Sequence, residues 1–95
     1  MKRAISLPPW RVEFDRDAAR QLRKLAAPVR DKIKAYLSER VASAPDPRRF
    51  GKALTGALMG LWRYRVGDFR IIAKIERDRL VILVVAVAHR SAVYR

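Results

Sequence analysis

The last third of the chain decides the fold, and it reads GLWRYRVGDFRIIAKI at residues 60–75, ERDR at 76–79 and LVILVVAVAHRSAVYR at 80–95. The pair Gly67-Asp68 lies between alternating segments and is a strong signal for a two-residue hairpin turn. The apolar run at 80–88 is long and rich in β-branched residues, which is typical of a central strand. The stretch therefore predicts three strands, at 61–66, 69–75 and 80–88, joined by two tight turns.

The predicted turn also determines which residues share a face, because side chains along a strand alternate with period two. With Gly67 and Asp68 in the loop, Arg65 lies opposite Arg70. The expected core face then carries Trp62, Tyr64, Val66, Phe69, Ile71, Ala73 and Ile75. The opposite face, which we call the arginine face, carries Arg63, Arg65, Arg70, Ile72 and Lys74. Continuing through a second turn at 76–79 puts Ile75 opposite Leu80 and Arg70 opposite Val85, and adds Val81, Leu83, Val85, Val87 and His89 to the arginine face.

The arginine face is unusual because Arg63, Arg65 and Arg70 crowd together with no acid among the strand residues expected to share it. Like charges directly opposite one another in a sheet are unfavourable, by about 0.2–1 kcal/mol against a neutral pair. One interpretation is a solvated basic surface. The other is a polyanion site, in which a phosphate supplies the missing negative charge.

Composition narrows the class of protein. The 95 residues suit one domain, and 51% hydrophobic residues favour a globular fold over disorder. Lys and Arg total 22 against 9 Asp and Glu, which gives a net charge of +13 and points to nucleic acid, the ribosome or an acidic protein as partner. With no cysteine, a single histidine and few acids, we expect no metal site. No signal peptide or bilayer-spanning segment is evident, so we expect a cytoplasmic protein with no membrane partner.

The pattern of the first half of the chain predicts a layer of helices that covers the core face of the sheet. Residues 1–9 read as a loose lead-in, and 10–14 alternate as a first strand. Asp15 suits a helix N-cap, and a helical hairpin is expected over 16–43. A basic, mobile loop is expected at 44–59. The predicted fold class is α+β, with the two N-terminal helices packed on one face of a mainly antiparallel four-stranded sheet in a single domain over 1–95. That packing leaves the arginine face open.

The hairpin LWRYRVGDFRII and the closing AHRSAVYR resemble the RelE toxins of the RelE/ParE superfamily, and the likeness covers nearly the whole chain. It implies a RelE-like fold and a toxin of a type II toxin–antitoxin system. The implied activity is that of an mRNA interferase, a metal-independent endoribonuclease that cuts mRNA in the ribosomal A site. The implied partners are the ribosome, mRNA and an acidic RelB-like antitoxin, with operator DNA bound only through the antitoxin complex.

The same resemblance assigns roles to particular residues. Arg63 and Arg65 match basic residues of the family that are often lysines, and either can hold phosphate. Arg70 matches the arginine that stabilises the scissile phosphate. Arg90 matches an arginine implicated in stabilising the leaving group, and Tyr94 matches the tyrosine proposed as the base that deprotonates the 2′-hydroxyl.

Two further predictions concern the proton and the RNA. His89 is a secondary candidate for the catalytic acid or base, because an unperturbed imidazole has a pKa of about 6.5 and can both give and take a proton near neutral pH. The sequence leaves open whether Tyr94 or His89 takes the proton. We also expect four basic residues to contact RNA or the ribosome through charge, namely Arg48, Arg49, Lys52 and Lys74.

Two rival functions are compatible with the sequence. A ParE-like toxin of the same fold would inhibit DNA gyrase without nuclease activity. ParE members generally lack the arginine and terminal tyrosine constellation, so Arg70, Arg90 and Tyr94 favour the RelE interpretation. A non-enzymatic protein that binds RNA or the ribosome would explain the net charge but would make Tyr94 incidental.

Overall fold

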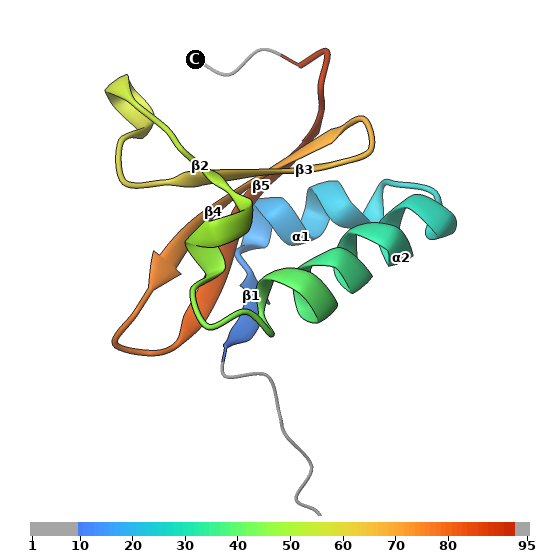
Figure 1. Ribbon diagram of the computed structural model, residues 1–95. Coiled ribbons are helices and arrows are strands. Elements are labelled where there is room, and N and C mark those ends of the chain that lie inside the picture. The colour runs from blue at the N-terminus through green and yellow to red at the C-terminus, as the bar shows by residue number, and fades with distance from the viewer. Residues whose placement is uncertain (1–9, 93–95) are drawn as a thin grey trace, which may run out of the picture.

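The computed structural model describes residues 10–92 and contains one sheet with helices on one of its faces (Figure 1). The strands are β1 (Arg11–Phe14), β2 (Lys52–Ala53), β3 (Trp62–Val66), β4 (Phe69–Glu76) and β5 (Val81–His89). The helices are α1 (Arg16–Arg23), α2 (Ala27–Ala35), the π-helical segment η1 (Tyr36–Val41) and the 3₁₀ turns η2 (Pro47–Phe50) and η3 (Gly56–Leu58). The strand order is β1-β5-β4-β3-β2, with β1 parallel to β5 and the other pairs antiparallel.

The helices begin where the local chemistry predicts. Asp15 caps α1, because its Oδ1 accepts a hydrogen bond from the amide of Ala18 at 2.9 Å. Pro28 lies in the first turn of α2, where its missing N–H costs nothing. The chain then continues into η1, in which the amide of Ala42 donates to the carbonyl of Leu37 at 2.8 Å. The predicted helical hairpin is therefore present, and its last turn is wider than an α-helix.

The core lies between these helices and the predicted core face of the sheet. Three helical side chains, Ile33, Leu37 and Val41, are fully buried at 0% exposure. They belong to one cluster with sheet residues that include Tyr64, Val66, Ile71, Ala73, Ile82, Val84 and Val87. The helices α1 and α2 therefore do not cover the opposite face of β2, β3 and β4 (Figure 1).

The first hairpin has the predicted register. Arg65 pairs with Arg70, Tyr64 with Ile71 and Trp62 with Ala73. Gly67 adopts φ +58° in the turn, a conformation that glycine reaches without steric cost. The arginine face is therefore formed by β3 and β4 as predicted.

The predicted register of the second hairpin is wrong. Arg70 pairs with Ala88 rather than Val85, and Ile75 pairs with Ile82 rather than Leu80. The turn occupies 77–80, one residue later than expected, and β5 has a bulge that leaves Val85 as the extra residue. A bulge reverses the alternation of the strand beyond it.

The bulge changes which β5 residues lie on the arginine face. Ala86 and Ala88 pair with Ile72 and Arg70 and therefore share their face. Val87 and His89 pair with Ile71 and Phe69 and lie on the core face, contrary to the prediction for both. Val81 and Leu83, which precede the bulge, remain on the arginine face as predicted.

The sheet has five strands, not four, because β2 was not expected. The segment 44–59 is folded rather than a mobile loop, since it contains η2, β2 and η3. Lys52 pairs with Arg63, and Ala53 pairs with Trp62. The buried hydroxyl of Tyr64 donates to the carbonyl of Pro47 at 2.7 Å and fixes η2 against the sheet. This long-range contact holds β2 beside β3, and a two-residue strand has no periodic pattern that could reveal it.

Candidate functional site

The arginine face brings five cationic side chains onto neighbouring strands. The register places Lys52 opposite Arg63 and Arg65 opposite Arg70. Lys74 lies on the same face of β4, four residues after Arg70. None of these five side chains forms an ion pair with a carboxylate from residues 10–92. The structure thus gathers these five cations, which we call the arginine row, on one face of β2, β3 and β4.

Arg70 is the most constrained of these cations. Its Nε atom is buried and has no hydrogen-bond partner among the described residues. A buried donor without a partner costs about 1–3 kcal/mol, and more when the group is charged. Its β5 neighbours on this face, Ala88 and Ala86, have only methyl side chains. A bound anion would supply the acceptor that this nitrogen lacks.

His89 lies away from this row. Its ring stands edge-on to Phe69, with ring centroids 5.4 Å apart and planes at 90°. Its Nδ1 lies 2.8 Å from the Ser91 hydroxyl and accepts a hydrogen bond from the Ser91 amide at 3.2 Å. Because Nδ1 is the acceptor, the neutral ring carries its proton on Nε2. Its predicted place on the arginine face is wrong, because the β5 bulge turns it to the other side.

Arg90 lies beside the turn of the first hairpin. Its amide donates to the carbonyl of Asp68 at 2.6 Å, and its Nε lies 3.6 Å from the Asp68 carboxylate. Both side chains are about two-thirds exposed, at 66% and 65%, so this pair is open to exchange with another anion. Arg90 is thereby held near the Arg65–Arg70 pair. The predicted base, Tyr94, lies outside the described residues.

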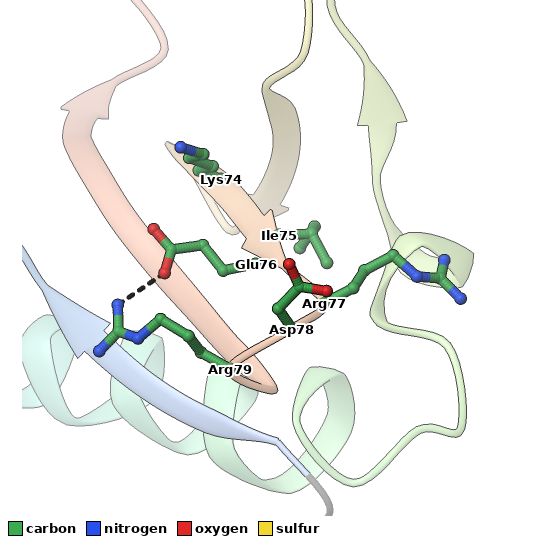
Figure 2. A pocket seen from close by; sticks show the side chains of 6 residues that line it. All are labelled: Lys74, Ile75, Glu76, Arg77, Asp78 and Arg79. Carbon is green, nitrogen blue, oxygen red and sulfur yellow. Dashed lines mark hydrogen bonds and ion pairs between the residues drawn. The ribbon is translucent and has the colours of Figure 1, made fainter.

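A hollow of about 550 Å³ lies at the β4–β5 turn, and of the arginine row only Lys74 lines it (Figure 2). Figure 2 shows Arg79 paired with Glu76, at 2.6 Å, and Arg79 also lies 3.5 Å from Glu13. The two carboxylates raise the pKa of Arg79. Glu76 and Glu13 lie on the same sheet face as the arginines, so the prediction of a face without acids is wrong at this far end. A polyanion is therefore favoured over β2–β4 rather than here.

The basic residues of η2 differ in their availability. Asp46 accepts hydrogen bonds from the Arg48 amide at 3.1 Å and from its guanidinium at 2.8–3.2 Å. These bonds lower the pKa of Asp46 to about 2 and raise that of Arg48. Arg48 is thus engaged in capping η2, whereas Arg49 is exposed and forms no ion pair within 10–92.

The structure also reveals a residue that the sequence reasoning missed. Phe50 is 38% exposed and lines a hollow of about 270 Å³ together with Lys52, Arg63 and Arg65. The local sequence RRFGK places an aromatic among basic residues, and that interleaving is the signal that could have identified it.

Between Trp10 and Ala92 no helix is long and apolar enough to cross a bilayer. Over the same residues no three His, Cys, Asp or Glu side chains come together in a way that could hold a metal ion.

The model of the ParE toxin family, from the parDE type II toxin–antitoxin systems, matches residues 12–94. The chain belongs to the RelE/ParE superfamily of type II toxins. Toxin RelE of Mycobacterium tuberculosis is 35% identical over 89 residues, which cover 92% of this chain and 88% of that one. Toxin RelG of the same organism is 28% identical over 87 residues, covering 92% and 98%. The predicted membership is therefore confirmed, and the chain is a RelE-like toxin of a type II toxin–antitoxin system.

Solved structures agree with this assignment at the level of the fold. The toxin–antitoxin complex RelBE2 from M. tuberculosis superposes with a TM-score of 0.79 at 24% identity, covering 95% of this chain and 100% of that one. The intact RelBE complex of E. coli gives a TM-score of 0.67 at 19% identity, covering 90% and 99%. The predicted RelE-like α+β fold is confirmed, with one more strand than expected.

Proposed function

We propose that this toxin is a ribosome-dependent endoribonuclease that cuts mRNA in the A site, with the arginine face as its active site. The observation that carries the proposal is the part of the arginine row formed by Lys52, Arg63, Arg65 and Arg70. It has no carboxylate partner within residues 10–92 and contains the buried, unpartnered Nε of Arg70. Like charges placed side by side on a sheet destabilise the folded chain, so stability alone does not favour such a row. It is well suited to the charge that develops on a phosphate during transfer.

The reaction follows from what the RNA itself supplies. The 2′-hydroxyl loses its proton and attacks the adjacent phosphorus, and the bond from phosphorus to the 5′-oxygen breaks. The products are a 2′,3′-cyclic phosphate and a 5′-hydroxyl, whose oxygen takes a proton from water as it leaves. In this reaction Arg70 and Arg65 would stabilise the negative charge on the phosphoryl oxygens, and Arg90, which is held beside Asp68, would stabilise the leaving oxygen. Tyr94 is the proposed base; because the nucleophile belongs to the RNA, the reaction needs no cofactor.

The partners follow from the surface charge and from the relatives. Several similar structures are toxin–antitoxin complexes named RelBE, and we infer that an acidic RelB-like antitoxin neutralises this toxin as well. Such an antitoxin would complement the net charge of +13. Ribosomes and mRNA place the reaction in the cytoplasm, and operator DNA would be bound only through the antitoxin complex.

A second candidate function is inhibition of DNA gyrase, because the family model that matches residues 12–94 is described as a ParE toxin. Gyrase inhibition would use the same fold without nuclease chemistry. The crowded cations around Arg70 would then have no catalytic role, which makes this the weaker proposal.

The test compares purified toxin on ribosomes programmed with a defined mRNA and on the same mRNA without ribosomes, with cut positions mapped by primer extension. We expect cuts within the A-site codon only when ribosomes are present. An mRNA with a 2′-deoxynucleotide at the cut position should resist cleavage at that position, because its nucleophile is missing. Intact mRNA together with inhibition of gyrase supercoiling by folded toxin would overturn the proposal in favour of the second candidate.

A further inference from the structure

Phe50 is an exposed aromatic ring in a cationic setting. Only three large hydrophobic side chains are exposed within residues 10–92, namely Phe50, Met59 and Leu80. Of these, Phe50 is the one that lines a hollow with three cations, and the hollow of about 270 Å³ is shared with Lys52, Arg63 and Arg65. The ring thus lies at the β2 edge of the arginine face.

The ring is presented by an anchored segment rather than by a loose loop. Asp46 caps η2 at its start, and the fully buried Tyr64 donates its hydroxyl proton to the carbonyl of Pro47 at 2.7 Å. Gly51 allows the chain to pass close to the sheet, because a Cβ there would lie 2.9 Å from Cε1 of Tyr64 and 3.2 Å from the carbonyl oxygen of Arg63. Directly after Gly51 the chain pairs with β3 through Lys52. Phe50 is therefore held from both sides.

The position of the ring relative to Arg70 suggests its ligand. Strands β4, β3 and β2 are neighbours, so Lys52 on β2 lies two strand spacings across the sheet and two residues along it from Arg70, a separation of about 12 Å. An RNA strand with its scissile phosphate at Arg70 and its next phosphates over Arg63 and Lys52 would bring a neighbouring base to Phe50. Unpaired bases commonly stack on aromatic side chains next to cations that hold the backbone.

We propose that Phe50 is a stacking platform for an unpaired RNA base near the cleaved bond, with Lys52 and Arg63 holding the adjoining phosphates. This inference rests on the proposed function only in taking RNA as the ligand. An acidic protein segment would use the cations, but it has no need of a flat exposed ring. The pocket would let the toxin hold a nucleotide through stacking, which tolerates any base because every base has a π-face.

The experiment measures the affinity of the full-length toxin for two short labelled oligomers by fluorescence anisotropy. One is a 2′-O-methyl oligoadenylate, which cannot be cleaved, and the other has the same backbone without bases. We expect the toxin to bind the base-bearing oligomer on the order of 10-fold more tightly. Phe50→Leu, which keeps an apolar side chain of similar size, should abolish this preference, and Phe50→Trp should retain it. The matched control Lys52→Gln should weaken the binding of both oligomers by the same factor, because it removes only a phosphate contact.

The outcomes separate this inference from the proposed function. Retention of the base preference in Phe50→Leu, or its absence in the wild type, would overturn the stacking platform. Loss of binding to polyglutamate in Phe50→Leu with an unchanged base preference would assign the pocket to an acidic protein and also overturn it. Cleavage on ribosomes is scored separately with the same variants. A Phe50-dependent base preference without any cleavage would support the platform while contradicting the nuclease.

Discussion

Removing one oxygen from the core, by Tyr64→Phe, should loosen the β2 edge of the arginine face. The Tyr64 side chain is 0% exposed, and its hydroxyl donates to the buried carbonyl of Pro47 at 2.7 Å. Phenylalanine keeps the ring in place but leaves that carbonyl without its donor. An unsatisfied buried group costs about 1–3 kcal/mol, out of a total stability of about 5–15 kcal/mol for a typical domain.

The loss should be measurable by urea denaturation followed by tryptophan fluorescence. For a domain of this size each kcal/mol corresponds to about 4–8 °C in Tm. Tyr36→Phe is the matched control, since Tyr36 is only partly buried and its hydroxyl forms no hydrogen bond within the described chain. Hydrogen exchange at the Gly51 amide, which donates to the carbonyl of Arg48, should accelerate in Tyr64→Phe alone.

The same side chain predicts a dependence on pH. Burial raises the pKa of Tyr64 above its ordinary value of 10.0, so the folded chain keeps a proton that the unfolded chain loses in alkali. Its contribution to stability is therefore complete below pH 10.0 and declines as the pH rises further. Tyr64→Phe should lack this part of the alkaline loss. Equal urea midpoints for Tyr64→Phe and Tyr36→Phe, with unchanged exchange at Gly51, would refute the anchoring of η2 by this hydroxyl.

Three further predictions test individual contacts. Gly51→Ala should destabilise the fold by about 1–3 kcal/mol in urea denaturation, because its Cβ would lie 2.9 Å from the buried ring of Tyr64; wild-type stability would show that the segment moves freely. Leu80→Asn should raise the Tm. Leu80 is 47% exposed and adopts φ 54°, a left-handed conformation that costs about 1–2 kcal/mol for leucine and that asparagine tolerates better. A lower Tm would mean that the apolar contacts of Leu80 outweigh the strain. The carboxylate of Asp46 should titrate near pH 2 by NMR. Its contribution to the stability of the fold is therefore present at neutral pH and declines as the pH falls towards that value. Arg48→Gln should raise the pKa of Asp46, and an unchanged pKa would contradict the hydrogen bonds from Arg48.

The sequence was sufficient for the first hairpin because its register is fixed locally. Gly67 and Asp68 specify the turn, charged residues alternate with apolar ones along β3, and Arg70 and Lys74 lie on one face of β4. A slip by one residue would bury Arg65 and Arg70, so the alternation admits a single pairing. The row of cations on the open face could be derived from the same pattern.

The second hairpin could not be derived in this way. Residues 80–88 are apolar throughout, so either set of alternate side chains can face the core and polarity does not fix the register. The bulge at Val85 has no signal in the sequence, yet it decides that His89 lies beside Phe69 and away from Arg70. Strand β2 was missed for a different reason, since it depends on contacts of η2 with Tyr64 that are distant along the chain.

The central claim is that the arginine face performs the cleavage, and the cleavage rate of ribosome-bound mRNA under single-turnover conditions tests it most directly. Arg70→Ala is compared with Arg23→Ala, which removes an exposed arginine from the helical layer. We predict that Arg70→Ala lowers the rate about 10²–10³-fold, the effect typical of removing one group that stabilises developing charge. Arg23→Ala should cleave at the wild-type rate. A folded Arg70→Ala toxin that cleaves as fast as the wild type would contradict the account.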